Sequence, residues 1–285
     1  MTDVKCFESG DPVAWCPGCG NHMLLKALKR ALAELDLQPH QVLVCSGIGQ
    51  AAKTPHYLRV NGFNGLHGRA VPPATGAKIA NKDMIVIINT GDGDSYGEGG
   101  NHFLHNMRRN INVAHFVHDN QIYGLTKGQA SPTTRPGHVT GLQSEGVILA
   151  PLNPLALAIT QGATFVARGF VGEQDHLVSL MKQAIQHQGY ALVDILQPCV
   201  VFNKVNTFQW YKERVYMLPE SHDPSVMTAA LAKTREWDDG IPLGLIYLEN
   251  RPDYHTLTDV LREGPPLVDR KPNPRLAESF LEDFR

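Results

Sequence analysis

The sequence lacks several features that would place it in other protein classes. Neither sign of charge dominates, because lysine and arginine number 26 and aspartate and glutamate 28, for a formal net charge of −2. No basic block carries the charge that phosphate-backbone binding requires, which argues against a nucleic-acid-binding protein. No apolar run approaches the roughly 20 residues of a membrane-spanning helix, and the N-terminal stretch MTDVKCFESG has no apolar signal core. We therefore expect a cytoplasmic protein that binds neither nucleic acid nor membrane.

Cysteine is scarce, with five among 285 residues. An odd, small number in a cytoplasmic chain argues for metal or redox chemistry over a disulfide framework. Cys16 and Cys19 form a C-x-x-C motif just before residues 22–35, whose apolar spacing predicts a helix. The motif has three interpretations: a thioredoxin-like dithiol, half of a zinc site, or part of an iron–sulfur ligand set. Zinc would need scattered partners because no second C-x-x-C or H-x-x-x-H is present, and the stretch before Trp15 is too short for the strand that precedes a thioredoxin motif.

A short apolar run at residues 84–89, MIVIIN, predicts a strand buried on both faces. A glycine–acid turn, GDGD, follows at residues 91–94. Glycines there let the backbone approach a ligand, and the carboxylates face outward at the C-terminal end of the strand. Residues 98–110 then predict a helix whose N-terminal amides would add partial positive charge beside a phosphate.

A second buried strand, VAHFV at residues 113–117, ends at Asp119 and Asn120. Because the C-terminal ends of adjacent parallel strands share one crevice, Asp92 and Asn120 should lie close together. One carboxylate, one amide oxygen and a nearby backbone carbonyl, with two diphosphate oxygens and water, would complete the oxygen octahedron of Mg²⁺. The stretch therefore predicts a magnesium–diphosphate site.

These residues resemble a known family. GDG followed just under thirty residues later by asparagine resembles the thiamine diphosphate-binding signature, and NHFLHNMRRN with DNQIYGLTKGQASPTT resembles the beta subunits of 2-oxoacid:ferredoxin oxidoreductases. The resemblance implies that Asp92, Asn120 and the carbonyl of Ile122 hold Mg²⁺. It implies a set of residues around thiamine diphosphate that comprises Gly91, Asp92, Gly93, Asp94, Asn120, Ile122, Tyr123, Gly124, Leu125 and Thr126.

The string WCPGCGNH resembles the cluster-binding motif of the same subunits, which implies that Cys16 and Cys19 bind a [4Fe-4S] cluster. Cys199 follows the strand LVDIL and matches the family's late cluster cysteine.

The remaining ligand departs from the family pattern. Family members usually carry a cysteine at the end of SGIGC, whereas this chain has Gln50, a poor iron ligand. We predict that Cys45, immediately before the motif, takes its place. The alternative is that Cys45 is a small buried residue at a strand end, and Cys6 is a further candidate.

Two side chains are candidates for catalytic roles. His67, in the family-like string HGRAVP, precedes a predicted helix at residues 74–80 and would contact substrate or thiamine, unless it is a structural hydrogen-bonding residue. Lys127 lies in the loop at residues 123–129, which the resemblance places over the thiazolium and the substrate. Lys53 would meet a substrate carboxylate or be solvated.

Strand and helix alternate from residue 40 to 199, which is typical of an α/β protein. We predict a doubly wound, mostly parallel sheet with helices on both faces, and the resemblance makes this the thiamine diphosphate-binding fold with a C-terminal extension. The alternation includes, beyond the stretches above, a helix at 153–161, a strand at 162–168, a helix at 173–188 and a strand at 191–196.

We assign residues 1–200 to a thiamine diphosphate- and iron–sulfur-binding domain. Residues 201–285, with a helix candidate at 225–237 and a strand candidate at 243–248, would form an arm that packs on the core or on a partner subunit.

The resemblance implies coenzyme A-dependent oxidative decarboxylation of a 2-oxoacid, with 2-oxoglutarate favoured and ferredoxin as electron acceptor. It also implies an (αβ)₂ assembly in which the alpha subunit supplies an activating glutamate that we cannot match in this chain. Two alternatives stay open. One is the diphosphate-binding subunit of a non-oxidative thiamine-dependent 2-oxoacid decarboxylase, in which the cysteines are structural. The other is a non-catalytic assembly subunit that keeps the fold but has lost its cluster.

Overall fold

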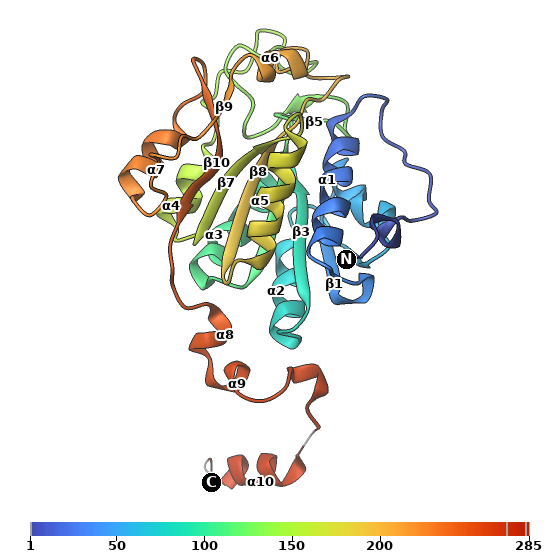
Figure 1. Ribbon diagram of the computed structural model, residues 1–285, viewed down its shortest axis with the longest axis vertical. Coiled ribbons are helices and arrows are strands. Elements are labelled where there is room, and N and C mark those ends of the chain that lie inside the picture. The colour runs from blue at the N-terminus through green and yellow to red at the C-terminus, as the bar shows by residue number, and fades with distance from the viewer. Residues whose placement is uncertain (1, 272, 283, 285) are drawn as a thin grey trace.

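One eight-stranded sheet organises the chain in the computed structural model, which describes residues 2–271, 273–282 and 284 (Figure 1). The strand order is β2-β1-β3-β4-β8-β7-β10-β9, and all neighbours are parallel except the antiparallel pair β7–β10. The strands are β1 (Val42–Ser46), β2 (Asn61–Asn64), β3 (Ile85–Gly91), β4 (Val113–Asp119), β7 (Phe165–Phe170), β8 (Tyr190–Leu196), β9 (Val215–Met217) and β10 (Ile241–Leu248). This confirms the predicted α/β fold with a mostly parallel sheet.

Helices cover both faces of the sheet and bury two separate cores. One core lies under α1 (Gly20–Glu34) and α5 (Gln174–Gln186). The other lies under α2 (Val71–Ala80), α3 (Gly100–Arg109), α4 (Pro154–Thr160) and α7 (Met227–Thr234). Alternate residues of the central strands supply the two cores, as the period of two in a strand requires. No helix in the described ranges is both long and apolar enough to cross a lipid bilayer.

The glycine–acid stretch after β3 is helical, so the predicted turn was wrong. Asp92 has helical φ and ψ of −58° and −43°, and Gly93–Glu98 forms a π-helical turn that leads through Gly99 into α3. A Cβ at Gly99 would lie 2.8 Å from the carbonyl oxygen of Asp94, so the close winding depends on glycine. Single π-helical turns are frequent at functional sites.

The stretch between β1 and α2 also contains regular structure. A 3₁₀ segment spans Ala51–Tyr57, and Asn61–Asn64 forms the edge strand β2, which pairs with β1. All four residues of β2 are exposed, so the sequence shows no apolar alternation there.

The segment after residue 200 first extends the sheet. It contains α6 (Phe208–Lys212), β9, α7 and β10; α7 lies within the predicted helix 225–237, and β10 includes the predicted strand 243–248. The chain then forms two short helices, α8 (Tyr254–Leu257) and α9 (Asp259–Arg262). The segment after α9 is tied to the end of α2, because Lys82 Nζ donates to the carbonyl oxygen of Gly264 at 2.7 Å. Figure 1 shows α10 (Pro274–Glu282) at the far end, away from the sheet. Contact of this arm with a partner subunit stays a prediction.

His115, in the centre of β4, should make stability depend on pH. Its ring nitrogens contact the Tyr190 hydroxyl at 2.6 Å and the Thr90 hydroxyl at 2.9 Å, and burial lowers its pKa to about 3. The folded protein therefore holds neutral imidazole. Its stabilising contribution is complete above the ordinary histidine pKa of about 6.5 and is lost, at about 1.4 kcal/mol per pH unit, as pH falls towards 3.

We expect His115→Gln to flatten the fall in Tm of the purified protein between pH 7 and pH 5. His105→Gln, at an exposed position of α3, is the control and should keep the wild-type slope. Equal slopes in all three proteins would show that His115 does not contribute.

Candidate functional site

A cavity of about 350 Å³ opens at the C-terminal ends of β1, β3 and β4. Its walls come from the loop after β1, the π-helical turn and the hairpin of β5 (Ile122–Tyr123) and β6 (Gln129–Ala130). The structure brings every predicted cofactor-binding residue, and His67, to this cavity. Lining residues that no prediction assigned to the cofactor are Ile48, Gly49, Gln50, Ala51, Glu98 and Gln129.

Asp92 is the buried acid of the cavity. The Thr133 hydroxyl donates to Asp92 Oδ2 at 2.6 Å, and the carboxyl group is almost fully buried. Burial raises the pKa of Asp92 to about 6, and the nearby carboxylate of Asp194 adds to the rise. A divalent cation beside Asp92 would reverse this effect and keep it charged, so its position fits a metal ligand. Thr133 lies in the string DNQIYGLTKGQASPTT, but no pattern in that string predicts its contact with Asp92.

Asn120 reaches the same cavity through two consecutive side-chain turns. Asp119 Oδ1 accepts from the Gln121 amide at 3.2 Å, and Asn120 Oδ1 accepts from the Ile122 amide at 3.0 Å. Gln121 adopts a positive φ of 57°, which turns the chain from β4 into β5. Asp92, Asn120 and Ile122 thus offer carboxylate, amide and carbonyl oxygens to one cavity, and hard oxygen donors are what Mg²⁺ requires.

Asp94 holds together the loops that frame the cavity. Its Oδ1 accepts from the backbone amides of Ile48 at 3.0 Å and Gly68 at 2.8 Å, and burial raises its pKa. A Cβ at Gly47 would overlap the Asp94 carboxylate, so the approach requires glycine. Asp94 Oδ2 is buried and has no hydrogen-bond partner in the part of the chain that the structure describes, which normally costs about 1–3 kcal/mol. A bound group that offers an N–H or O–H would satisfy this oxygen.

Cys16, Cys19 and Cys199 converge beside the cavity. Burial raises the pKa of Cys19, and the charges of Cys199 and Cys16 lie close enough to raise it further. The C-x-x-C loop packs on the loop after β8, where a Cβ at Gly20 would lie 2.9 Å from Gln197 Cβ. Among the side chains that the structure describes, no group of three or more His, Cys, Asp or Glu forms a site for a single metal ion. Binding of a cluster by these cysteines therefore stays a prediction.

Cys45 lies on the opposite face of the sheet from the C-x-x-C motif. It is fully buried with Ala74 and Ile88 in the core under α2 and α3, whereas Cys19 packs against the core under α1. Burial raises the pKa of Cys45 to about 12, which disfavours the thiolate that iron would bind. Its position therefore speaks against the prediction that Cys45 is a cluster ligand and fits the alternative of a small buried residue.

The two candidate catalytic side chains differ in their position relative to the cavity. His67 is exposed and lines the cavity near Asp94. Lys127, with φ of 84°, lies in the turn of the β5–β6 hairpin, is exposed and does not line the cavity. A catalytic role for either residue stays a prediction.

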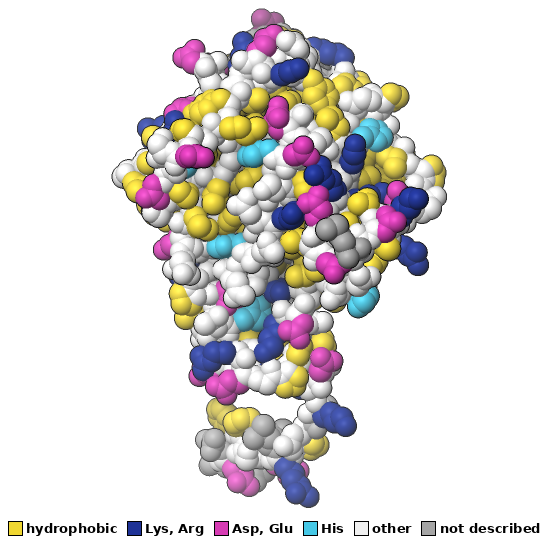
Figure 2. All heavy atoms as spheres, viewed as in Figure 1, with side chains coloured by type: hydrophobic (Ala, Val, Ile, Leu, Met, Phe, Trp, Pro, Cys, Tyr) yellow, Lys and Arg dark blue, Asp and Glu magenta, His cyan; other side chains and the backbone are white. Residues whose placement is uncertain are grey.

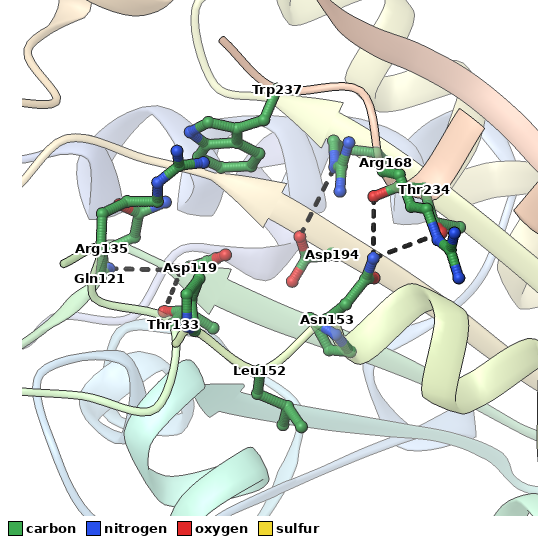
Figure 3. Close-up of a pocket in the computed structure, with 13 residues that line it drawn as sticks. Asp119, Gln121, Thr133, Arg135, Leu152, Asn153, Arg168, Asp194, Thr234 and Trp237 are labelled. Atoms are coloured by element: carbon green, nitrogen blue, oxygen red, sulfur yellow. Dashed lines mark hydrogen bonds and ion pairs between the residues drawn. The ribbon is translucent and has the colours of Figure 1, made fainter. Parts of the chain in front are cut away.

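A second cavity, of about 230 Å³, lies between β4, β8 and the loop that carries Trp237 (Figure 3). Arg168 on β7 and Asp194 on β8 are cross-strand neighbours, with Nε and Oδ2 3.9 Å apart. The Tyr96 hydroxyl donates to Asp194 Oδ1 at 2.7 Å, and the Arg168 guanidinium lies 5.4 Å from the Trp237 ring centroid. Figure 3 shows Asp119 on the other side of this cavity, facing the same space.

Thr133 connects the two cavities. Its hydroxyl lies 2.6 Å from Asp92 Oδ2 and 3.0 Å from Asp119 Oδ1. Asp92, the candidate metal ligand, therefore belongs to a buried polar network, which the apolar strand patterns did not indicate.

Two family models match consecutive parts of the chain. Residues 40–195 match the C-terminal thiamine pyrophosphate (TPP)-binding domain of thiamine pyrophosphate enzymes, and residues 199–263 match the C-terminal part of the pyruvate ferredoxin oxidoreductase beta subunit. The beta subunit of 2-oxoacid:ferredoxin oxidoreductase 1 from Aeropyrum pernix is 43% identical over 269 residues, which cover 90% of this chain and 85% of that protein. This chain belongs to the beta subunits of the 2-oxoacid:ferredoxin oxidoreductases. The family resemblance seen in the sequence is therefore confirmed.

Other relatives of this beta subunit agree. The beta subunit of 2-oxoacid:ferredoxin oxidoreductase from Saccharolobus solfataricus is 46% identical, and the match covers 82% of this chain and 81% of that protein. KorB of 2-oxoglutarate oxidoreductase from Mycobacterium tuberculosis is 45% identical over 70% of this chain and 53% of its own length. The solved 2-oxoglutarate:ferredoxin oxidoreductase from Magnetococcus marinus, with 2-oxoglutarate, coenzyme A and succinyl-CoA bound, superposes with a TM-score of 0.92. It is 37% identical, and the match covers 99% of this beta subunit and 96% of that chain.

Proposed function

We propose that this beta subunit binds thiamine diphosphate and Mg²⁺ and, with an alpha subunit, oxidises 2-oxoglutarate to its coenzyme A thioester while reducing ferredoxin. The observation that carries the proposal is the cavity at the ends of β3 and β4, where Asp92, Asn120 and Ile122 meet among glycines. The names and ligands of the relatives favour 2-oxoglutarate and coenzyme A. A cytoplasmic location and an (αβ)₂ assembly stay predictions from the sequence.

The residues of the cavity fit the cofactor. Asp92, Asn120 and the Ile122 carbonyl would hold Mg²⁺ against a diphosphate, and the buried free oxygen of Asp94 would accept a hydrogen bond. When bound, thiamine diphosphate supplies the carbon centre at which a 2-oxoacid loses CO₂. The chain's own contribution is to orient that group: Thr133 fixes the Asp92 carboxylate and Asp94 fixes the loops around the opening.

An exposed apolar surface beside the cavity fits an alpha subunit. A depression of about 940 Å³ shares Tyr123 with the cofactor cavity and is rimmed by Leu142, Ile148 and Leu149. Their exposed fractions are 75%, 89% and 73%, which is unusual for large apolar side chains grouped together. Figure 2 shows hydrophobic side chains exposed over much of the upper half of the molecule, the end where the parallel strands terminate in Figure 1. We infer that the alpha subunit covers this depression and completes the site.

Product analysis of the purified alpha–beta complex tests the proposal. With a panel of 2-oxoacids, coenzyme A, ferredoxin, thiamine diphosphate and Mg²⁺ under anaerobic conditions, we expect succinyl-CoA from 2-oxoglutarate to form fastest. Release of CO₂ and an aldehyde without a thioester would instead support the non-oxidative decarboxylase. Absence of bound thiamine diphosphate would support the non-catalytic assembly subunit.

Gly93 should be intolerant of any side chain because the Tyr123 ring lies against it. A Cβ at Gly93 would overlap the ring carbons of Tyr123, so this ring, which lines the cavity, would have to shift. We expect Gly93→Ala to weaken thiamine diphosphate binding to the complex by at least about tenfold, which corresponds to about 1.4 kcal/mol.

Titration of the cofactor-free complex with thiamine diphosphate measures this effect. Gly100→Ala is the matched control, because a Cβ there meets nothing within 4 Å although the residue lies only a helical turn or two away. Equal affinities of the two variants would contradict a steric role for Gly93.

A further inference from the structure

We propose that Gln50 takes the fourth ligand position of an iron–sulfur site whose other ligands are Cys16, Cys19 and Cys199. One iron of the cluster would then have no thiolate ligand. The inference rests on the proposed function and on the [4Fe-4S] cluster that the sequence predicts, and it concerns which residues hold that cluster and how firmly.

Gln50 lies between the C-x-x-C segment and Cys199. Trp15, which precedes Cys16, donates its indole N–H to the Gln50 carbonyl oxygen at 2.8 Å. A Cβ built on Gly124 would lie 3.9 Å from Cys199 Sγ and 3.9 Å from Gln50 Cγ, so both side chains flank the same glycine. Gln50 is thus tied to the C-x-x-C segment on one side and lies beside Cys199 on the other.

The Gln50 side chain has an unused acceptor at this position. Its Oε1 is buried and has no hydrogen-bond partner among the described residues, although Gln50 also lines the cofactor cavity. Buried polar oxygens are rarely left without a partner, so a group bound between the cysteines and the cavity would explain it. Cys45, the ligand predicted from the sequence, lies in the core on the far face of the sheet.

Replacement of a thiolate by a carboxamide changes the cluster in two ways. A carboxamide oxygen is a neutral, hard donor, whereas iron–sulfur clusters are held by soft thiolates, so the iron at this corner is bound more weakly than the other three. One-electron oxidation by ferricyanide should release it: [4Fe-4S]²⁺ gives [3Fe-4S]⁺ and Fe²⁺, with one electron passed to ferricyanide. The missing negative charge should also raise the reduction potential of the four-iron form, since net charge is one of the determinants of that potential.

Gln50→Cys in the anaerobically purified alpha–beta complex tests the proposal. We expect the wild-type complex to lose one iron in four on ferricyanide treatment and to show the EPR signal of an oxidised three-iron cluster, which is paramagnetic. Gln50→Cys should keep all four irons, stay EPR-silent when oxidised, and have a reduction potential below that of the wild type. Cys45→Ala is the control and should match the wild type in iron content and EPR.

Three results would overturn the proposal. In the first, the wild-type and Gln50→Cys complexes resist ferricyanide equally. In the second, Cys45→Ala contains less iron than the wild type. In the third, neither the wild type nor Gln50→Cys contains iron. Thiamine diphosphate content, measured on the same samples, separates this failure from failure of the proposed function. A complex that binds the cofactor but fails the iron test refutes only the assignment of Gln50 to the cluster.

Discussion

Asp92→Ala should lower 2-oxoacid turnover by the alpha–beta complex more than about 100-fold, since even residues that only orient a metal ligand typically contribute 10- to 100-fold. Asp92 is the one carboxylate among the three residues that we assign to Mg²⁺, and its removal takes away the charge that offsets the cation. Loss of Mg²⁺ would release the diphosphate, so we expect the variant to lose thiamine diphosphate on gel filtration while its far-UV circular dichroism stays unchanged.

Asp83→Ala provides the matched control for this prediction. Asp83 is an exposed acid that precedes the other end of the same strand, β3, so its removal changes the net charge equally without touching the cavity. We expect normal cofactor content and turnover from this variant. Full cofactor retention and turnover by Asp92→Ala would show that the metal lies elsewhere.

Arg168→Met should cost about 3–5 kcal/mol of unfolding free energy, the usual effect of removing one partner from a buried ion pair. The exposed fractions of Arg168 and Asp194 are 3% and 1%, so water cannot replace the lost partner. Asp194 would keep the hydrogen bond from the Tyr96 hydroxyl but would lie unpaired in charge close to the buried carboxyl groups of Asp119 and Asp92. Denaturant unfolding of the purified protein measures the change.

Two further variants sharpen this test. Arg168→Met combined with Asp194→Asn removes both charges and should cost less than the sum of the two single substitutions. Arg135→Met breaks an exposed pair with Asp238 and should cost no more than about 1 kcal/mol. Additive effects of the double variant, or equal effects of Arg168→Met and Arg135→Met, would contradict a buried charge network behind the site.

The sequence predicted which residues meet in the cavity of about 350 Å³, because these residues follow the ends of apolar strands. Asp92 and Asn120 each come directly after a buried run, and parallel strands must deliver such residues to one edge. Thr133 escaped prediction because its contact with Asp92 depends on the path of an irregular loop, which no periodicity records. The edge strand β2 escaped because it buries no apolar face.

Cys45 shows how strand geometry corrects a prediction made from proximity in the sequence. Val42 and Val44 of β1 lie in the core under α1, so the next residue must point to the other face. The period of two therefore places Cys45 on the face of the sheet away from the C-x-x-C motif, although Cys45 lies only five residues before Gln50 in the chain. Arg168 and Asp194 were read as parts of apolar strands, and their pairing required the register between β7 and β8.

We propose that this beta subunit and its alpha subunit together couple 2-oxoacid decarboxylation to electron transfer through the cavity that contains Asp92. The decisive experiment counts the ferredoxin reduced per CO₂ released in anaerobic assays with 2-oxoglutarate and coenzyme A. We expect two one-electron ferredoxin reductions per CO₂ from the complex, and none from either subunit alone or from the complex with Asp92→Ala. Release of CO₂ without reduction of ferredoxin, or turnover by the isolated beta subunit, would contradict the claim.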